Sequence, residues 1–542
     1  MVKITVTKDL FPTLFGGIGF HNNEAALYKV MDQEHFNQVI CKIYREISPG
    51  YMRTFAGFSD WTIEAMNDFA EYYEKMQKWT DTPMYICGHK GKIHFSDDEI
   101  KQYAEDVAEN LNYLINQKGV KHIRYYCFTN EMSHCGWGVL MENLPLFKKY
   151  HEMLYRSFAK RKLNIGLLAT DASGFENWGT MDWAIQNMSQ ITEDYCLHIY
   201  ENEHDIYDHD YYYFFYDKCK EVVDKALRDD GKRVILGEYG VTKGANVQYG
   251  QGIIRDICSY FYSGESAHAA LMLSEMAFAA INAGIFMIGL WSFTDYPDPY
   301  SCAHAETGYA KKWGEAEPFV SLTTDVKYNK WGMTKWEDNG DYSARPHYWC
   351  IGLLVKYFKR NSKVLTLSCN DRNIRMCGIL NKDGSISIGI INRNKQNTKV
   401  QIDIGVPVEK KLRVYEFDSN NVPENPFCDL QNYSSIVKVI DSIITYELLA
   451  ESMTIFTTDY IERDYPVYAT GVTVDANNLV WDEINDHNHC YYRVYASNER
   501  DFVPSPSNQI ASTVATHLPN INKNLSCYKV LSVDKSGNCY KC

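Results

Sequence analysis

Residues 233–240 read Arg-Val-Ile-Leu-Gly-Glu-Tyr-Gly, a short apolar run that reaches a carboxylate at Glu238. Residues 123–131 are similar: Ile-Arg-Tyr-Tyr-Cys-Phe-Thr-Asn-Glu, a run that ends at Glu131. Short and nearly continuous apolar runs are typical of strands in a buried parallel sheet. The two stretches therefore predict parallel strands whose carboxyl ends carry acidic side chains.

Working outward from these two runs, similar strands alternate with longer helical patterns. One helix is predicted over 97–117, after the capping box Ser96-Asp-Asp-Glu99. Eight strand–helix units in roughly 340 residues predict an α/β fold, a (β/α)8 TIM barrel over residues 1-358. A doubly wound sheet is the alternative, but the number of units and the lack of a Gly-rich phosphate loop count against it. The eight strands are predicted at 14–20, 50–55, 84–87, 123–128, 165–170, 195–200, 233–238 and 285–291.

The pattern changes after Phe358 to short, alternating segments separated by turn residues, which predicts a β-sandwich over 359-460. Within residues 1–12, the run 2–7 is expected to join this sandwich, because the barrel does not need it. A further small β domain is predicted over 461-542. Its segments 479–481, 491–495 and 528–534 resemble a fibronectin type III domain.

Composition limits the classes of partner. The chain has 542 residues and a net charge of -14, with no basic run, so a nucleic-acid partner is not expected. No stretch reaches the roughly 18 apolar residues of a membrane span. The 16 cysteines show no disulfide framework and the first residues lack a signal-peptide pattern, so we expect a cytoplasmic protein. A leader already removed from the chain would instead imply secretion.

The strand ends carry the expected chemistry. Barrel active sites lie where the strands end at the carboxyl-terminal face. Glu131 ends the fourth predicted strand and Glu238 ends the seventh. Hydrolysis of a glycosidic bond uses two carboxyl groups, and a separation of about 5–5.5 Å gives retention of configuration. The alternative is a structural ion pair at each strand end, which the order and flanks of the two residues make less attractive.

The sequence Asn130-Glu131 on strand four, with Glu238 on strand seven, resembles clan A of the glycoside hydrolases. The resemblance implies that Glu131 is the general acid/base and Glu238 the nucleophile. It also implies that Asn130 binds the 2-hydroxyl of the sugar. No metal and no organic cofactor are expected.

Other strand ends fit the same resemblance, although packing or a generic salt bridge is the alternative reading of each. Arg53 on strand two is expected beside the nucleophile, where a fixed cation keeps Glu238 ionised. The resemblance also implies sugar-binding roles for His198 and Tyr200 on strand six and for Trp291 on strand eight. His21 and His89 end strands one and three, where they are expected either to touch sugar hydroxyls or to pack.

Within the clan, the His-x-Tyr strand, the stretch Trp291-Ser-Phe-Thr-Asp295 and the following sandwich resemble family 39 most closely. That family usually has Pro after its Asn-Glu, whereas Met132 follows here, as in family 51 arabinofuranosidases. Gly237-Glu-Tyr-Gly240 also resembles family 5. Two other patterns are discounted: the acidic and His-rich stretch 198–210 as a metal site, because it lacks helical ligand spacing, and the isolated Cys539-Tyr-Lys-Cys542 as a redox motif.

The functional hypothesis is a retaining glycoside hydrolase that acts on a small oligosaccharide. It would be exo-acting on a β-linked xylose, glucose or galactose, or on an α-L-arabinofuranoside. The alternatives are a transglycosylase with the same residues and a non-catalytic carbohydrate-binding protein on a degenerate hydrolase barrel. The sequence predicts no oligomeric state.

Overall fold

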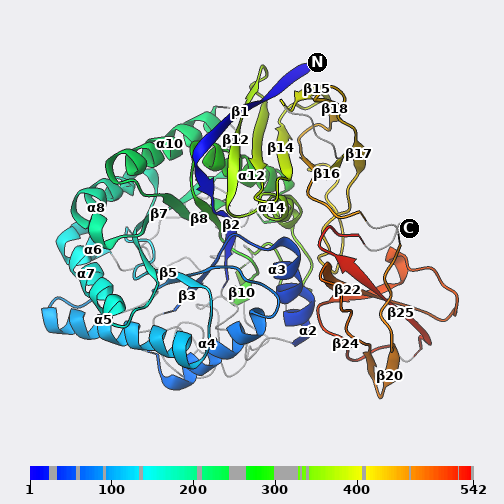
Figure 1. Ribbon diagram of the computed structural model, residues 1–542, viewed down its shortest axis with the longest axis horizontal. Coiled ribbons are helices and arrows are strands. Elements are labelled where there is room, and N and C mark those ends of the chain that lie inside the picture. Colours follow the sequence, from blue (N-terminus) through cyan, green and yellow to red (C-terminus); the bar gives the residue numbers. More distant parts are fainter. Residues whose placement is uncertain are drawn as a thin grey trace.

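The structure is a computed structural model, and it divides the chain into a helix-covered barrel and two β-rich bodies (Figure 1). The barrel is formed by the N-terminal half of the chain, apart from its first strand. The last described residues lie in the smaller β-rich body. The structure describes residues 1–22, 33–56, 61–88, 93–133, 138–203, 210–242, 264–297, 328–329, 332–336, 341–405, 411–462, 465–522 and 524–538.

Eight parallel strands close into the barrel, as predicted. The last strand pairs with the first, with Ile18 opposite Ile288, so the barrel has no open edge. Its strands are nearly all buried, which explains why their sequences are apolar runs. The barrel strands are β2 (Gly17–His21), β3 (Met52–Phe55), β4 (Met84–Cys87), β5 (Ile123–Cys127), β6 (Gly166–Ser173), β7 (Asp194–Asn202), β8 (Val234–Thr242) and β9 (Met287–Leu290).

Helices surround the barrel. The Ser96 hydroxyl accepts a hydrogen bond from the Glu99 amide at 3.4 Å and donates to the Glu99 carboxylate at 2.6 Å, which caps α5. Gly284 ends α12 with a positive φ of 94°. The helices are α2 (Gln33–His35), α3 (Lys42–Ile47), α4 (Ile63–Met76), α5 (Asp97–Asn112), α6 (Gly138–Glu142), α7 (Leu144–Lys160), α8 (Thr180–Met188), α10 (Tyr211–Asp230), α12 (Ala267–Ala283) and α14 (Pro346–Tyr357).

The predicted first barrel strand, 14–20, is wrong at its start. Leu14 and Phe15 are the end of β1 (Val2–Phe15), which belongs to another sheet, and the barrel strand begins at Gly17. Gly17 has a φ of 106°, and a Cβ there would lie 2.6 Å from the Gly50 Cα. A glycine is therefore needed where the chain leaves one sheet and enters the next.

The larger β-rich body is one nine-stranded ladder in which β1 lies between β12 and β15. β1 is antiparallel to β12 and parallel to β15. Ile402 of β15 shares one core with Ile390 of β14 and Val414 of β16, so the ladder folds over itself into a sandwich. The other strands are β12 (Ser362–Cys369), β13 (Ile374–Leu380), β14 (Ile386–Asn392), β15 (Thr398–Asp403), β16 (Leu412–Asp418), β17 (Ser435–Val437), β18 (Ile443–Leu448) and β19 (Ser452–Thr457).

The C-terminal body has two three-stranded sheets, ordered β20-β21-β24 and β23-β22-β25. Leu479 and Trp481 pack against Tyr492 and Val494 in one core, as in two facing sheets. Its strands are β20 (Thr473–Asp475), β21 (Asn478–Val480), β22 (His489–Ser497), β23 (Gln509–Thr513), β24 (His517–Leu518) and β25 (Cys527–Asp534).

One buried carboxylate, Asp429, connects all three bodies. It lies 2.8 Å from the Lys42 ammonium of α3 and 2.8 Å from Arg493 Nε of β22. Gln509 and Ser512 of β23 donate to it at 3.0 and 2.9 Å. Two cations and two neutral donors therefore compensate the buried charge.

Among the described helices, none has both the length and the apolar character that a bilayer crossing requires.

Candidate active site

Glu131 and Glu238 come together at the carboxyl end of the barrel, as the strand-end argument predicts. Glu238 lies on β8, and Glu131 follows the end of β5. One carboxylate oxygen of each, and one ring nitrogen of His198, all lie within 4.8 Å of one another. Glu238 is buried, whereas the Glu131 side chain keeps 15% of its surface exposed. The two carboxyl groups therefore differ in their access to solvent.

Glu238 is surrounded by groups that bind its charged form. Its Oε1 forms an ion pair with Arg53 Nη1, and its Oε2 accepts a hydrogen bond of 2.6 Å from the Tyr200 hydroxyl. Burial and the nearby Glu131 carboxylate raise the pKa of Glu238 above its ordinary value, and Arg53, His198 and the Tyr200 hydrogen bond offset only part of that rise. These partners hold a negative charge in a place where water cannot solvate it.

Arg53, fully buried on β3, connects several of the predicted site residues. Its Nη2 donates to Asn130 Oδ1 at 2.7 Å and contacts Cys87 Sγ at 3.2 Å. Its Nη1 lies 3.0 Å from His21 Nδ1. Because Asn130 Oδ1 accepts from Arg53, its amide is oriented so that Nδ2 is the donor on the other side.

His198 lies between acidic groups on both of its nitrogens. Nδ1 is 3.4 Å from Glu131 Oε1 and 3.7 Å from Glu238 Oε2, and Nε2 is 2.8 Å from Asp171 Oδ1. Burial lowers the pKa of His198, but the Asp171 and Glu238 carboxylates outweigh it and raise the pKa well above the ordinary value. The surrounding carboxylates therefore favour the charged form of the His198 ring.

Asp171 is the site residue that the sequence analysis missed. It lies on β6 and is completely buried. Burial raises its pKa, but His198 and Arg53 outweigh burial, so the pKa of Asp171 lies below the ordinary value. The fifth strand was predicted to end at Thr170, three residues before its observed end at Ser173, so Asp171 was left outside it. The criterion that selected Glu131 and Glu238, an acidic residue at the end of a barrel strand, would have found it.

Trp291 lies directly after β9, the eighth barrel strand, and is half-buried. Its ring centroid is 4.1 Å from that of His21 and 5.6 Å from that of Phe55. His21 itself is almost completely buried. The three rings form an aromatic wall beside Arg53. The sugar-binding roles of Trp291 and His21 remain predictions.

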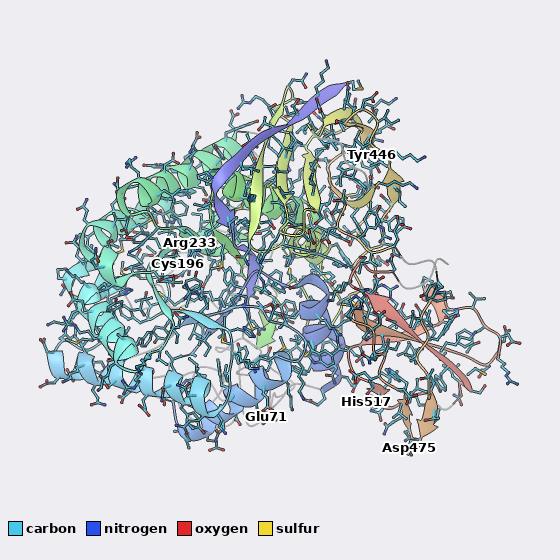
Figure 2. All side chains as sticks on the ribbon, in the orientation of Figure 1. Glu71, Cys196, Arg233, Tyr446, Asp475 and His517 are labelled. Carbon is cyan, nitrogen blue, oxygen red and sulfur yellow. The ribbon has the colours of Figure 1, made fainter. Side chains whose placement is uncertain are left out.

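Some predicted features lie outside the described residues: His89, residues 204–209 of the stretch 198–210, and the pair Cys539 and Cys542. Among the described residues, two groups of three side chains have ligand atoms close enough to hold a metal ion. One is Glu131, His198 and Glu238, and the other is Asp171, Cys196 and His198. Figure 2 shows Cys196 among the barrel strands. The Arg53 guanidinium contacts both Glu238 and Asp171, so a fixed positive charge already compensates each set.

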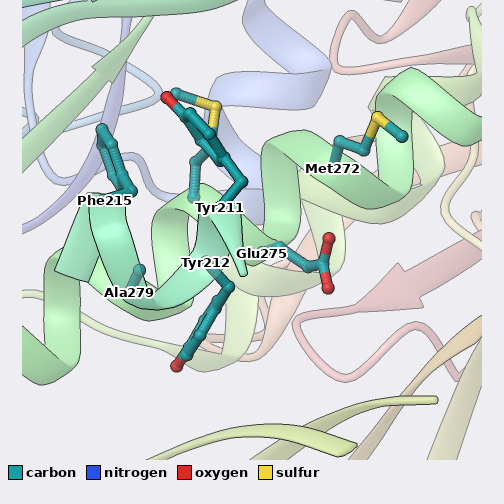
Figure 3. A pocket seen from close by; sticks show the side chains of 7 residues that line it. Tyr211, Tyr212, Phe215, Met272, Glu275 and Ala279 are labelled. Atoms are coloured by element: carbon teal, nitrogen blue, oxygen red, sulfur yellow. The ribbon is translucent and has the colours of Figure 1, made fainter. Parts of the chain in front are cut away.

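A small cavity between α10 and α12 is separate from these residues (Figure 3). Its volume is about 10 Å³, which is near the minimum for one water molecule. Tyr211, Phe215 and Glu275 are among its lining residues. The Glu275 carboxylate lies 3.3 Å from Arg375 Nε and 3.4 Å from Arg393 Nε, an ion cluster between α12 and the sandwich. This small cavity between α10 and α12 is therefore not a candidate sugar site.

No protein-family model matches the sequence, and no curated protein matches it. Solved structures do match. The catalytic domain of the family 30 xylanase C from Talaromyces cellulolyticus aligns with a TM-score of 0.56 and 13% identity, covering 84% of this chain and 99% of that one. The family 51 arabinofuranosidase from Xanthomonas axonopodis pv. citri aligns with a TM-score of 0.55 and 13% identity, covering 84% and 100%. The endo-β1,6-glucanase BT3312 gives 0.54 and 13%, covering 84% and 94%.

Family 51 is among the families that the motifs resemble; family 30 was not predicted, and the closer resemblance to family 39 stays a prediction. The chain has the barrel-and-β-domain fold of these glycoside hydrolases.

Proposed function

We propose that the chain is a retaining glycoside hydrolase of clan A, with Glu238 as nucleophile and Glu131 as general acid/base. The observation that carries this proposal is the approach of the two carboxylates, with oxygens within 4.8 Å. Retaining enzymes hold their carboxyl groups about 5–5.5 Å apart, whereas inverting enzymes need about 6.5–9.5 Å to admit a water. The spacing here favours the first class.

The two glutamates differ in the way that double displacement requires. In the first step Glu238 attacks the anomeric carbon while Glu131 gives its proton to the leaving oxygen. In the second step Glu131 takes a proton from water, which displaces Glu238 from the sugar. Arg53 and Tyr200 hold Glu238 as a carboxylate. The partly exposed Glu131 is the one that can exchange protons with leaving group and water.

The substrate class that we propose is a small oligosaccharide or glycoside. The similar structures carry names for xylan, arabinofuranoside and β1,6-glucan hydrolysis. We propose a β-linked xyloside, glucoside or galactoside, or an α-L-arabinofuranoside, cleaved from a chain end. Asn130 Nδ2, oriented by the bond from Arg53 to Oδ1, would donate to the sugar 2-hydroxyl.

The test is hydrolysis of nitrophenyl glycosides of these four sugars by the wild type, Glu238→Ala and Glu131→Ala. We expect one sugar to be cleaved, Glu238→Ala to be inactive, and azide to restore turnover with an inverted glycosyl azide as product. Glu131→Ala should keep partial activity on nitrophenyl substrates, whose good leaving group needs little protonation. Glu71→Ala, in a half-exposed ion pair with Lys75 on α4, is the matched control.

Two results would contradict the proposal. If both glutamate variants cleave the substrate as fast as the Glu71→Ala control, the catalytic pair is wrong. If the first-formed sugar product has inverted configuration by NMR, the double displacement is wrong. Products longer than the substrate at high sugar concentration would identify the transglycosylase alternative. Sugar binding without any turnover would favour the non-catalytic binding protein.

A further inference from the structure

Asp171 accepts hydrogen bonds from several strands at once. Its Oδ1 accepts from the Tyr85 hydroxyl of β4 at 2.8 Å and from Cys196 Sγ of β7 at 3.1 Å, and lies 2.8 Å from His198 Nε2. Its Oδ2 is 3.4 Å from Arg53 Nη2. A carboxylate with this many donors, and with no exposed surface, is built to remain charged.

We propose that Asp171 is a positioning residue that keeps His198 as an imidazolium facing both Glu131 and Glu238. The inference deepens the proposed glycosidase function and rests on it. A buried carboxylate bonded to one nitrogen of a histidine fixes the orientation of the ring and stabilises its charged form. In a neutral histidine only one nitrogen carries hydrogen. Nε2 lies 2.8 Å from Asp171 Oδ1 and Nδ1 lies 3.4 Å from Glu131 Oε1, and a ring that donates from both nitrogens carries a positive charge.

The charges explain why such an arrangement would serve catalysis. Arg53 and His198 carry two positive charges, and Asp171 and Glu238 carry two negative ones. This group of four is neutral, so Glu131 can hold its proton without leaving a net charge in the buried site. Loss of the Asp171 charge would leave one surplus positive charge beside Glu131, or would force His198 to give up its proton.

The surroundings of His198 contain other titratable groups, and each is already placed in the network. Arg53 reaches His198 through Asp171, and Tyr200 reaches it through Glu238. The titratable and charged side chains around His198 come from six barrel strands or the residues that follow them: Arg53 of β3, Tyr85 of β4, Glu131 after β5, Asp171 of β6, Cys196 and Tyr200 of β7, and Glu238 of β8.

Asp171 also holds the backbone of the general acid. The Glu131 amide lies 3.3 Å from Asp171 Oδ2, and the Met132 amide donates to the Asp171 carbonyl at 3.2 Å. Glu131 has a φ of 50°, in the left-handed region that a non-glycine residue adopts only at a cost in free energy. Asp171 itself has a φ of 62°. The hydrogen bonds between Asp171 and the amides of Glu131 and Met132 therefore help to hold both backbone segments in these conformations.

The first experiment measures the protonation of His198 directly and does not depend on turnover. The protein is labelled with ¹⁵N-histidine, and the His198 signals are assigned by their loss in His198→Gln. We expect both ring nitrogens of wild-type His198 to remain protonated from pH 5 to 9. In Asp171→Asn the ring should titrate within this range, near the ordinary value of about 6.5. A neutral His198 ring in the wild type at pH 7 would overturn the inference even if Asp171→Asn fails to fold.

The second experiment compares pH profiles of kcat/KM on the substrate found above. Asp171→Asn should lose about 100-fold at pH 8 and much less at pH 5, where His198 is protonated without help. Asp171→Glu should restore part of the pH 8 activity, because it restores the charge. A uniform loss at all pH values would mean a merely structural role and would sink the inference. If no nitrophenyl glycoside is cleaved, the proposed function is contradicted. The NMR measurement of His198 protonation does not depend on turnover, so it tests the role of Asp171 separately.

Discussion

Single side chains affect how readily the buried Glu238 carboxyl group carries a charge. Burial and the Glu131 carboxylate raise the pKa of Glu238, and three partners oppose that effect: Arg53, His198 and Tyr200. Of these, Tyr200 is the simplest to remove, because Phe keeps the ring and loses only the hydroxyl. Hydrogen bonds to charged groups contribute about 1.5–3 kcal/mol.

Tyr200→Phe should therefore lower kcat/KM by roughly 10- to 100-fold. The Tyr200 hydrogen bond lowers the pKa of Glu238, so its loss raises that pKa and moves the acidic limb of the pH profile to higher pH. The control is Tyr195→Phe, which removes a hydroxyl bonded to Asp230 at the opposite end of the same strand. An acidic limb that stays in place in Tyr200→Phe would mean that the nucleophile is not Glu238.

The approach of Glu131 and Glu238 was predictable because it depends on two strand ends in the correct order, and strand ends can be read from apolar runs. Arg53, Asn130, His198 and Tyr200 were predictable for the same reason, although their roles stay predictions. Their mutual contacts were not predictable. Asp171 Oδ1 receives donors from β4 and β7, and sequence alone does not give the distance between separate strands.

Among the strands and helices, one tight backbone contact lies at the amino-terminal end of the barrel strands, where Gly17 and Gly50 meet. A Cβ on Gly50 would lie 2.6 Å from the Gly17 Cα and 2.8 Å from the Gly16 carbonyl oxygen. These are backbone atoms, which cannot turn away as a side chain can. The same contact lies where β1 ends and β2 begins, so both sheets depend on it.

Gly50→Ala should lower the free energy of unfolding by about 3 kcal/mol or prevent folding. Thermal unfolding followed by circular dichroism measures this effect. Gly138→Ala, at the start of α6, is the matched control, because its Cβ would meet no atom within 4 Å. Equal melting temperatures for the two variants would show that this contact tolerates a side chain.

The strand bounds show what local pattern can and cannot predict. Strand 84–87 was predicted at its observed bounds, because its ends coincide with the ends of its apolar run. The segment 14–20 was assigned to one strand because Leu14 and Phe15 continue its apolar run. The division at Gly17 depends on a pairing between Leu14 and Lys363, which is far away in the sequence. In the sandwich, β12, β17 and β18 have exposed alternate residues, which give them a weaker apolar signal than the barrel strands have.

The whole molecule is joined through Asp429, whose charge serves the barrel, the sandwich and the C-terminal body together. Burial raises the pKa of Asp429, but Lys42 and Arg493 outweigh burial and hold the pKa below the ordinary value. Removal of one member of a buried ion pair costs about 3–5 kcal/mol, because the partner charge stays buried without compensation. This loss of stability should appear as less cooperative unfolding of the barrel, the sandwich and the C-terminal body.

Asp429→Asn should lower the melting temperature at pH 7 and separate the unfolding of the C-terminal body from that of the barrel. A carboxyl group with a lowered pKa stabilises the folded state above its unfolded value of about 4, and this stabilisation disappears as pH falls through the folded value. The difference from wild type should therefore shrink at pH 3. Asp475→Asn, at an exposed position on β20, is the control. An unchanged melting temperature at pH 7 would contradict the role of Asp429.

The position of β1 has a consequence for the order in which the chain can fold during synthesis. β1 pairs with β12 and β15, so its hydrogen-bonding partners lie in residues 362–403. At about 5–20 residues per second, the ribosome needs roughly 20–70 s to reach them. During that time β1 waits with two open edges, one of the hazards of long-range pairing. β1 is thus made long before its partners, and the barrel that follows it can form before the sandwich is complete.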